Sequence, residues 1–164
     1  MKRSSMINTE RIIKEIHTID WASYSGPDEF NPDEVSKALV KLLLIEDEND
    51  AWSTYNKVLF SIGNNHRGTY YSVAKEAIKY ILLTAISGER EVARNCALNI
   101  LVDLYGSFWP EPDNPILMKS ILSTIEDNKE VFIRIAENEA ESERNRSLTR
   151  ILLEDIASRT EENG

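Results

Sequence analysis

The 164-residue sequence has little of what several protein classes require. It has one cysteine, Cys96, together with six glycines and five prolines. A single cysteine excludes an intrachain disulfide and a thiolate metal cluster, and its apolar neighbours indicate a small core residue. Few glycines and prolines argue against disordered, collagen-like or many-turned all-β chains. The longest apolar runs, such as 42–45, are too short to span a membrane. We expect one domain over residues 1–164, located in the cytoplasm.

Positive charge is scarce. The chain has 19 Lys and Arg against 28 Asp and Glu, which gives a formal net charge of −9. Proteins that bind the phosphate backbone or an anionic membrane surface need a basic face. We therefore expect no direct nucleic-acid partner and no membrane partner. The acidity points instead to a basic partner.

The sequence also has few groups suited to catalysis. Its only histidines are His17 and His66, and neither has a partner at the spacing of a helical metal site. No nucleophile motif accompanies them. The turn 63–68 lacks the Lys-Ser/Thr of a phosphate-binding loop, and the acidic run 46–50 lacks the central Gly and closing Glu of a calcium loop. We expect no catalytic residue, no cofactor-binding residue and no metal ligand, and hence not an enzyme.

The apolar residues that are present recur at helical spacing, between breaks rich in Gly and Pro. Two helix starts are explicit, because Asn31-Pro32 and Asn114-Pro115 each place an N-cap amide before a first-turn proline. Nothing in the pattern alternates as a strand would. The sequence therefore predicts an all-α fold of about seven to eight helices. The apolar stripes begin at Val35, Trp52, Val73, Ala93, Leu117, Val131 and Leu148.

A faint internal repeat refines this prediction. The segment 38–43 resembles 77–82, and Ile81-Leu82 resembles Ile121-Leu122, each about 40 residues later, which is the period of HEAT-like helix pairs. We expect a HEAT-like α-solenoid of antiparallel helix pairs; an irregular helical bundle is the alternative. The expected parts are an N-terminal cap (1–30), helix-pair repeats (31–125) and acidic C-terminal helices (126–164).

Several turns place aromatic residues beside acidic ones. Trp and Tyr are enriched at binding hot spots, and acidic residues around them would attract a basic protein. The alternatives are packing between helix pairs for the aromatic residues and an ordinary solvated surface for the charges. The candidate partner-binding residues are Asp28, Glu29, Glu46, Asp47, Glu48, Tyr71, Trp109, Glu111 and Asp113.

The order of these features resembles a bacterial family of small HEAT-like proteins. The resemblance rests on Trp21 followed by Gly26-Pro27, on a helix pair containing Trp52, and on the run 66–71, which fits an H-x-G-T-x-Y turn before a helix. It covers the chain from Trp21 to Pro112. Some members of that family look like immunity proteins of contact-dependent growth inhibition and other polymorphic toxin systems.

The resemblance implies an immunity protein that binds and neutralises a cognate toxin domain. A basic nuclease is the expected toxin, because such enzymes need positive charge to hold nucleic acid. The alternative is a HEAT-like scaffold or adaptor protein that binds a peptide or protein partner. A helical-repeat DNA glycosylase is disfavoured by the negative charge. Whether the protein is a monomer or a weak dimer is left open.

Overall fold

The computed structural model describes residues 7–163, which form eight α-helices, two 3-10 turns and one small sheet. The expected all-α fold is confirmed. None of the helices described is both long enough and apolar enough to cross a membrane. The helices are α1 (Thr9–Thr18), α2 (Pro32–Leu44), α3 (Ala51–Ile62), α4 (Ala74–Ser87), α5 (Glu91–Gly106), α6 (Pro115–Glu126), α7 (Lys129–Glu137) and α8 (Glu143–Asn163).

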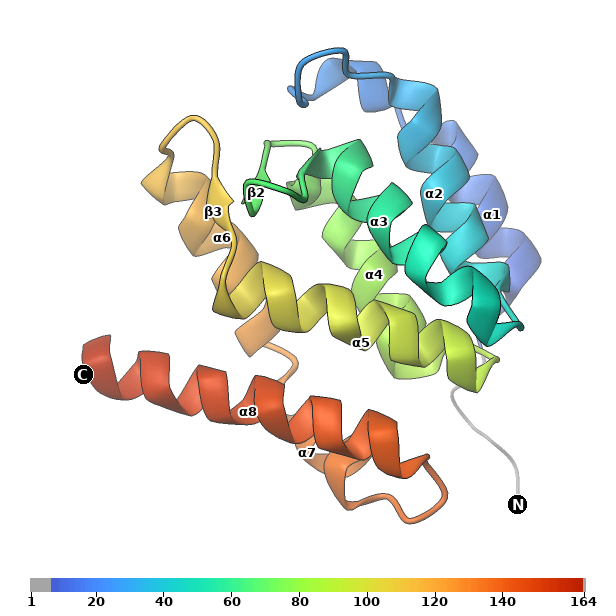
Figure 1. Cartoon of the computed structure of the whole chain (residues 1–164), viewed down its shortest axis with the longest axis vertical. Helices are drawn as coiled ribbons and strands as arrows, with labels where there is room; N and C mark the ends of the chain where they lie inside the picture. Colours follow the sequence, from blue (N-terminus) through green and yellow to red (C-terminus); the bar gives the residue numbers. More distant parts are fainter. Residues whose placement is uncertain (1–6, 164) are drawn as a thin grey trace.

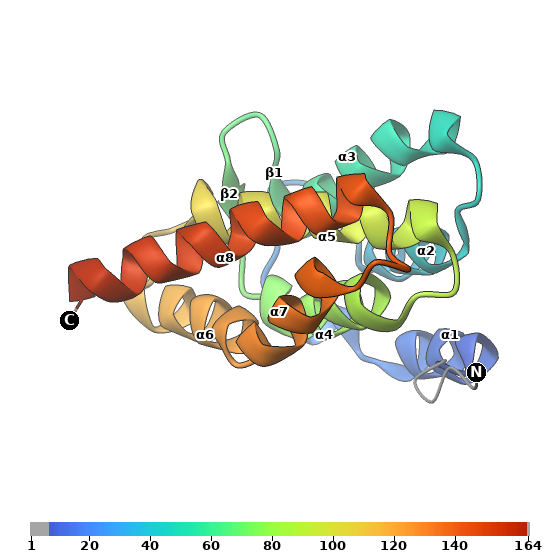
Figure 2. The same cartoon turned by 90° about the horizontal axis from the view of Figure 1, so that it is seen from below.

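The helices lie in two layers (Figure 1, Figure 2). The first layer holds α2, α4 and then α6 with α7, and the second holds α3, α5 and α8. Helices α2 and α3 form one pair, α4 and α5 a second, and α7 and α8 a third. In the third unit the first-layer helix is divided, because α6 ends at Glu126 and α7 begins at Lys129. This is the stacking of helix pairs expected for a HEAT-like arrangement.

The internal repeat lies on neighbouring helices of the first layer. Segment 38–43 belongs to α2 and segment 77–82 to α4, and these two helices pack against each other. Ala38, Leu39, Ala77 and Ile78 are all buried. A solenoid reuses one packing position in each unit, which explains why these segments resemble one another.

Both predicted Asn-Pro helix starts are confirmed. The side-chain oxygen of Asn31 accepts a hydrogen bond from the backbone N–H of Asp33 at 3.0 Å, and that of Asn114 accepts one from Leu117 at 3.1 Å. In each helix the proline occupies the first turn, where a backbone N–H has no helical partner to lose.

A small sheet was not expected from the sequence. Strand β1 (Gly63–Asn64) pairs antiparallel with β2 (Thr69–Tyr70), which pairs parallel with β3 (Trp109–Pro110). Strands of two residues are too short to show an alternating pattern. Gly63 is required by close approach, because a Cβ there would lie 1.9 Å from the carbonyl oxygen of Thr69.

Because the helices of each pair are antiparallel, successive turns fall at opposite ends of the stack (Figure 1). We call one end the loop end; it contains residues 24–31, 63–73 and 106–114. Its turns are joined by backbone hydrogen bonds, from Val73 to Ser25 at 3.0 Å and from Trp109 to Gly68 at 2.9 Å. We call the other the arginine end; it contains residues 45–50, 88–95 and 138–145.

Candidate binding surfaces

The nine candidate partner-binding residues do not form one surface. They divide between the two ends, which are separated by the length of helix α2, 13 residues or about 20 Å. Sequence reasoning grouped them because each lies in an acidic turn, without regard to which end a turn reaches. Asp28, Glu29, Tyr71, Trp109, Glu111 and Asp113 lie at the loop end, and Glu46, Asp47 and Glu48 at the arginine end.

At the loop end, Trp109 is the most prominent aromatic residue. Its side chain is 60% exposed, although it lies on strand β3. Tyr71 is half-buried, and burial raises the pKa of its phenol, as do the nearby carboxylates of Glu111 and Asp28. Glu111 forms an ion pair with Arg67 and accepts a hydrogen bond from the Thr69 hydroxyl at 2.7 Å. Residues from three separate turns therefore meet around Tyr71.

The remaining acids of the loop end are open to solvent. Asp28, Glu29 and Asp113 are exposed, and none of them forms an ion pair with any residue in the described range. Asp28 and Glu29 line a shallow hollow of about 280 Å³ together with Lys57 and Phe60. Their charge is available to an approaching molecule.

The acids of the arginine end have partners within the chain. Glu46 forms an ion pair with Arg90, and Glu48 forms one with Arg144 at 2.7 Å. Asp47 accepts a hydrogen bond from the backbone N–H of Asn49 at 2.9 Å, which caps the short turn before α3. These three residues thus have structural partners, whereas the exposed acids of the loop end do not.

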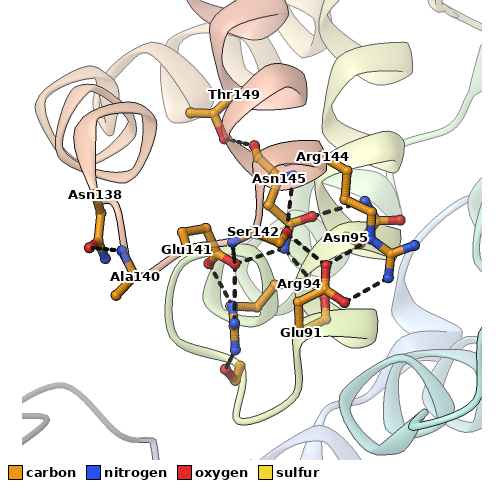
Figure 3. A network of polar contacts seen from close by, with 11 residues as sticks. Glu91, Arg94, Asn95, Asn138, Ala140, Glu141, Ser142, Arg144, Asn145 and Thr149 are labelled. Atoms are coloured by element: carbon orange, nitrogen blue, oxygen red, sulfur yellow. Dashed lines mark hydrogen bonds and ion pairs between the residues drawn. The ribbon is translucent and has the colours of Figure 1, made fainter.

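A nearly buried ion pair lies at the centre of the arginine end (Figure 3). Arg94 donates from Nε to Glu141 Oε2 at 2.9 Å and from Nη2 to Oε1 at 3.2 Å, and its Nη1 donates to the Gly88 carbonyl at 2.9 Å. The two side chains are 15% and 10% exposed. Burial alone would raise the pKa of Glu141, but the hydrogen bonds from Arg94 and from the Ser142 backbone hold it below the usual range.

The rest of this network ties α8 to the start of α5. Arg144 donates to both carboxylate oxygens of Glu91, at 2.7 and 2.6 Å, and these bonds lower the pKa of Glu91. The buried Asn145 accepts a hydrogen bond from Asn95 at 2.8 Å and donates one to Glu141 at 3.1 Å (Figure 3). Such paired groups position helices relative to one another.

Sequence reasoning missed a pocket of about 360 Å³ between α3 and α5. Trp52 was expected in the apolar stripe of its helix, and this expectation is wrong, because the side chain is 72% exposed. It lies in the first turn of α3, where its ring stacks on Tyr55 with the centroids 5.3 Å apart. The pocket is lined by Glu48, Ala51, Trp52, Tyr55, Asn95, Cys96, Asn99 and Asp103.

One signal for this pocket is present in the sequence. Asn95, Asn99 and Asp103 recur every four residues on helix α5, which places them on one face. Cys96 lies beneath them, and burial raises the pKa of its thiol to about 12. The thiol therefore stays protonated at neutral pH and packs as a small apolar group.

The described residues contain no cluster of three His, Cys, Asp or Glu side chains placed to hold a metal ion. Comparison of the chain with protein-family models, curated proteins and solved structures gives no match. The resemblance to HEAT-like immunity proteins stays a prediction from the sequence. Function is therefore argued from the surfaces themselves.

Proposed function

We propose that the protein binds a basic partner protein through its loop end, and that it is an immunity protein which neutralises a toxin domain of this kind. The observation that carries the proposal is the side chain of Trp109, which is 60% exposed at the end of the molecule that also holds the exposed acids Asp28, Glu29 and Asp113, unpaired within residues 7–163. A large exposed aromatic residue is typical of the anchors that dominate binding energy at protein interfaces.

Charge supports the choice of a basic partner. Asp28, Glu29 and Asp113 are exposed at this end, and the chain as a whole has a net charge of −9. Acidic residues around an aromatic anchor steer a basic protein into place and raise its association rate more than its final affinity. A nuclease domain fits this description, because its nucleic-acid groove must be positively charged. Occupation of that groove by the acidic loop end would block access of the substrate.

The test is co-expression with a toxin domain. The candidate is the C-terminal domain of a large secreted protein encoded next to this gene, if the neighbouring reading frame has that form. We expect the wild-type chain to restore growth and to bind the purified domain. Trp109→Ala is expected to weaken binding by about 30-fold or more, as for a hot-spot aromatic residue. Raising the salt concentration is expected to slow association.

Leu44→Ala is the matched control, since Leu44 is also an exposed apolar side chain, 42% exposed, but ends α2 at the opposite end. It should bind as the wild type does. Failure of the wild-type chain to bind or to restore growth would overturn the proposal. Equal binding to several unrelated domains would favour the alternative of a scaffold or adaptor protein.

A further inference from the structure

The pocket between α3 and α5 lies outside the loop end and has a different chemistry. We infer that it holds the guanidinium group of an arginine side chain presented by the partner. This inference rests on the proposed function in one respect, namely that the partner is basic. The argument starts from the walls of the pocket, which combine aromatic faces, amides and carboxylates.

One wall is aromatic. The rings of Trp52 and Tyr55 are stacked with an interplanar angle of 16°, so Tyr55 covers one face of the indole. The indole as a whole is 72% exposed. A cation over an aromatic face is attracted by the ring quadrupole, and Trp gives the strongest attraction. The chain already makes one such contact, because the guanidinium carbon of Arg159 lies 5.1 Å from the centre of the Tyr105 ring.

The other wall supplies acceptors. The Tyr55 hydroxyl donates to one carboxylate oxygen of Asp103, and no donor in residues 7–163 is bonded to the other oxygen. Asn99 donates through Nδ2 to the Asn95 carbonyl at 3.3 Å, so its side-chain oxygen is left as an acceptor. A guanidinium carries five N–H donors in one plane and no acceptor, which matches a carboxylate and an amide oxygen beside an aromatic face.

The charge of the pocket also favours a cation. Its lining contains two carboxylates, Glu48 and Asp103, and no Lys or Arg from the part of the chain described. Glu48 forms an ion pair with Arg144, which also pairs with Glu91. Asp103 forms no ion pair with any residue in the described range, so its negative charge is not neutralised there. An incoming arginine therefore gains a charge-assisted hydrogen bond at Asp103 without displacing an existing ion pair.

The test uses the full chain and a small probe, N-acetyl-arginine amide. Binding is followed by NMR through the indole N–H of Trp52 and the side-chain amide of Asn99. The neutral citrulline analogue has nearly the same shape but carries no charge, and we expect it to bind at least tenfold more weakly. The lysine analogue should bind more weakly than arginine, because an ammonium cannot match the planar acceptors.

Two variants locate the site. Trp52→Ala and Asp103→Asn are each expected to weaken arginine binding at least tenfold. Trp52 is mostly exposed, so its truncation keeps the test valid even if Asp103→Asn perturbs the fold through Tyr55. Ile116→Ala, which truncates another exposed apolar side chain at the start of α6, is the control and should bind the probe unchanged.

The inference is overturned if arginine and citrulline analogues bind equally, if lysine binds more tightly than arginine, or if Trp52→Ala leaves binding intact. Its failure is distinguishable from failure of the proposed function. Arginine binding needs no toxin domain, whereas growth restoration does. If the chain restores growth through Trp109 but does not bind the arginine probe, this inference alone is overturned. If the chain binds the probe but neither binds nor neutralises the toxin domain, the proposed function alone is overturned.

Discussion

The two ends of the molecule use carboxylates in opposite ways. At the arginine end, Glu91 and Glu141 are partly buried and each accepts two hydrogen bonds from an arginine. At the loop end, Asp28 and Asp113 are exposed and form no ion pair with another described residue. Carboxylates thus hold helices together at the arginine end, whereas Asp28 and Asp113 at the loop end have no cationic partner among the described residues. Net charge alone does not distinguish these uses.

The difference follows from what covers each end. The turn between α7 and α8 folds back over the start of α5, so the carboxylate of Glu141 is removed from water and requires a partner. The turns of the loop end are joined to each other mainly through their backbones, which leaves many of their side chains facing solvent. Substitutions at matched positions in the two ends should therefore have unequal effects on stability.

The largest expected effect is that of Arg94→Ala. It leaves the carboxylate of Glu141, 10% exposed, without its cation, and we expect a loss of about 3 kcal/mol in the free energy of unfolding. Arg67→Ala is the matched change at the loop end, where the arginine is 62% exposed and pairs with Glu111. It should cost at most about 1 kcal/mol. Urea unfolding measures both, and equal losses would contradict the comparison.

An intermediate effect is expected from acid. Folding lowers the pKa values of Glu91 and Glu141 from 4.5. The stability they contribute is therefore present above pH 4.5 and is lost as the pH falls through their lowered values. Urea midpoints measured from pH 7 to pH 3 should fall less steeply for Glu141→Gln than for the wild type. Asp113→Asn removes one negative charge at the loop end and should keep the wild-type slope. If Glu141→Gln also keeps that slope, Glu141 does not carry this pH dependence.

The smallest expected effect on stability belongs to Trp109→Ala. Its ring is mostly exposed, so its loss should change the free energy of unfolding by about 0.5 kcal/mol or less. Thermal unfolding followed by circular dichroism measures this change. A loss of several kcal/mol would mean that the ring supports the fold, and the loop end would then resemble the arginine end after all.

The fold was predictable where local signals agreed with packing. The Asn31-Pro32 start and the resemblance of 38–43 to 77–82 gave a helix boundary and two neighbouring helices, because caps and buried stripes depend on nearby residues. The sheet was not predictable, since its strands β2 and β3 come from turns far apart in the sequence and are held by backbone hydrogen bonds. Such bonds leave no side-chain pattern.

The candidate sites were predictable only in part. Trp109 and Glu111 lie two residues apart in one turn, and the sequence pointed to them directly. Trp52 was placed in an apolar stripe but is exposed, because helical spacing shows which residues share a face but not which helices cover that face. The ion pair between Arg94 and Glu141 joins α5 to the turn before α8, and a single sequence gives no sign of such a distant pair.

The pairing of β2 with β3 determines how freely the side chains of the loop end can be substituted. Trp109 donates its backbone N–H to the Gly68 carbonyl at 2.9 Å, and Glu111 donates to the Tyr70 carbonyl at 2.8 Å. Backbone bonds of this kind form with almost any side chain at positions 109 and 111. Mutation can therefore exchange the side chains that face outward while the turn keeps its shape. The chemistry of the loop-end surface can therefore change without loss of the fold.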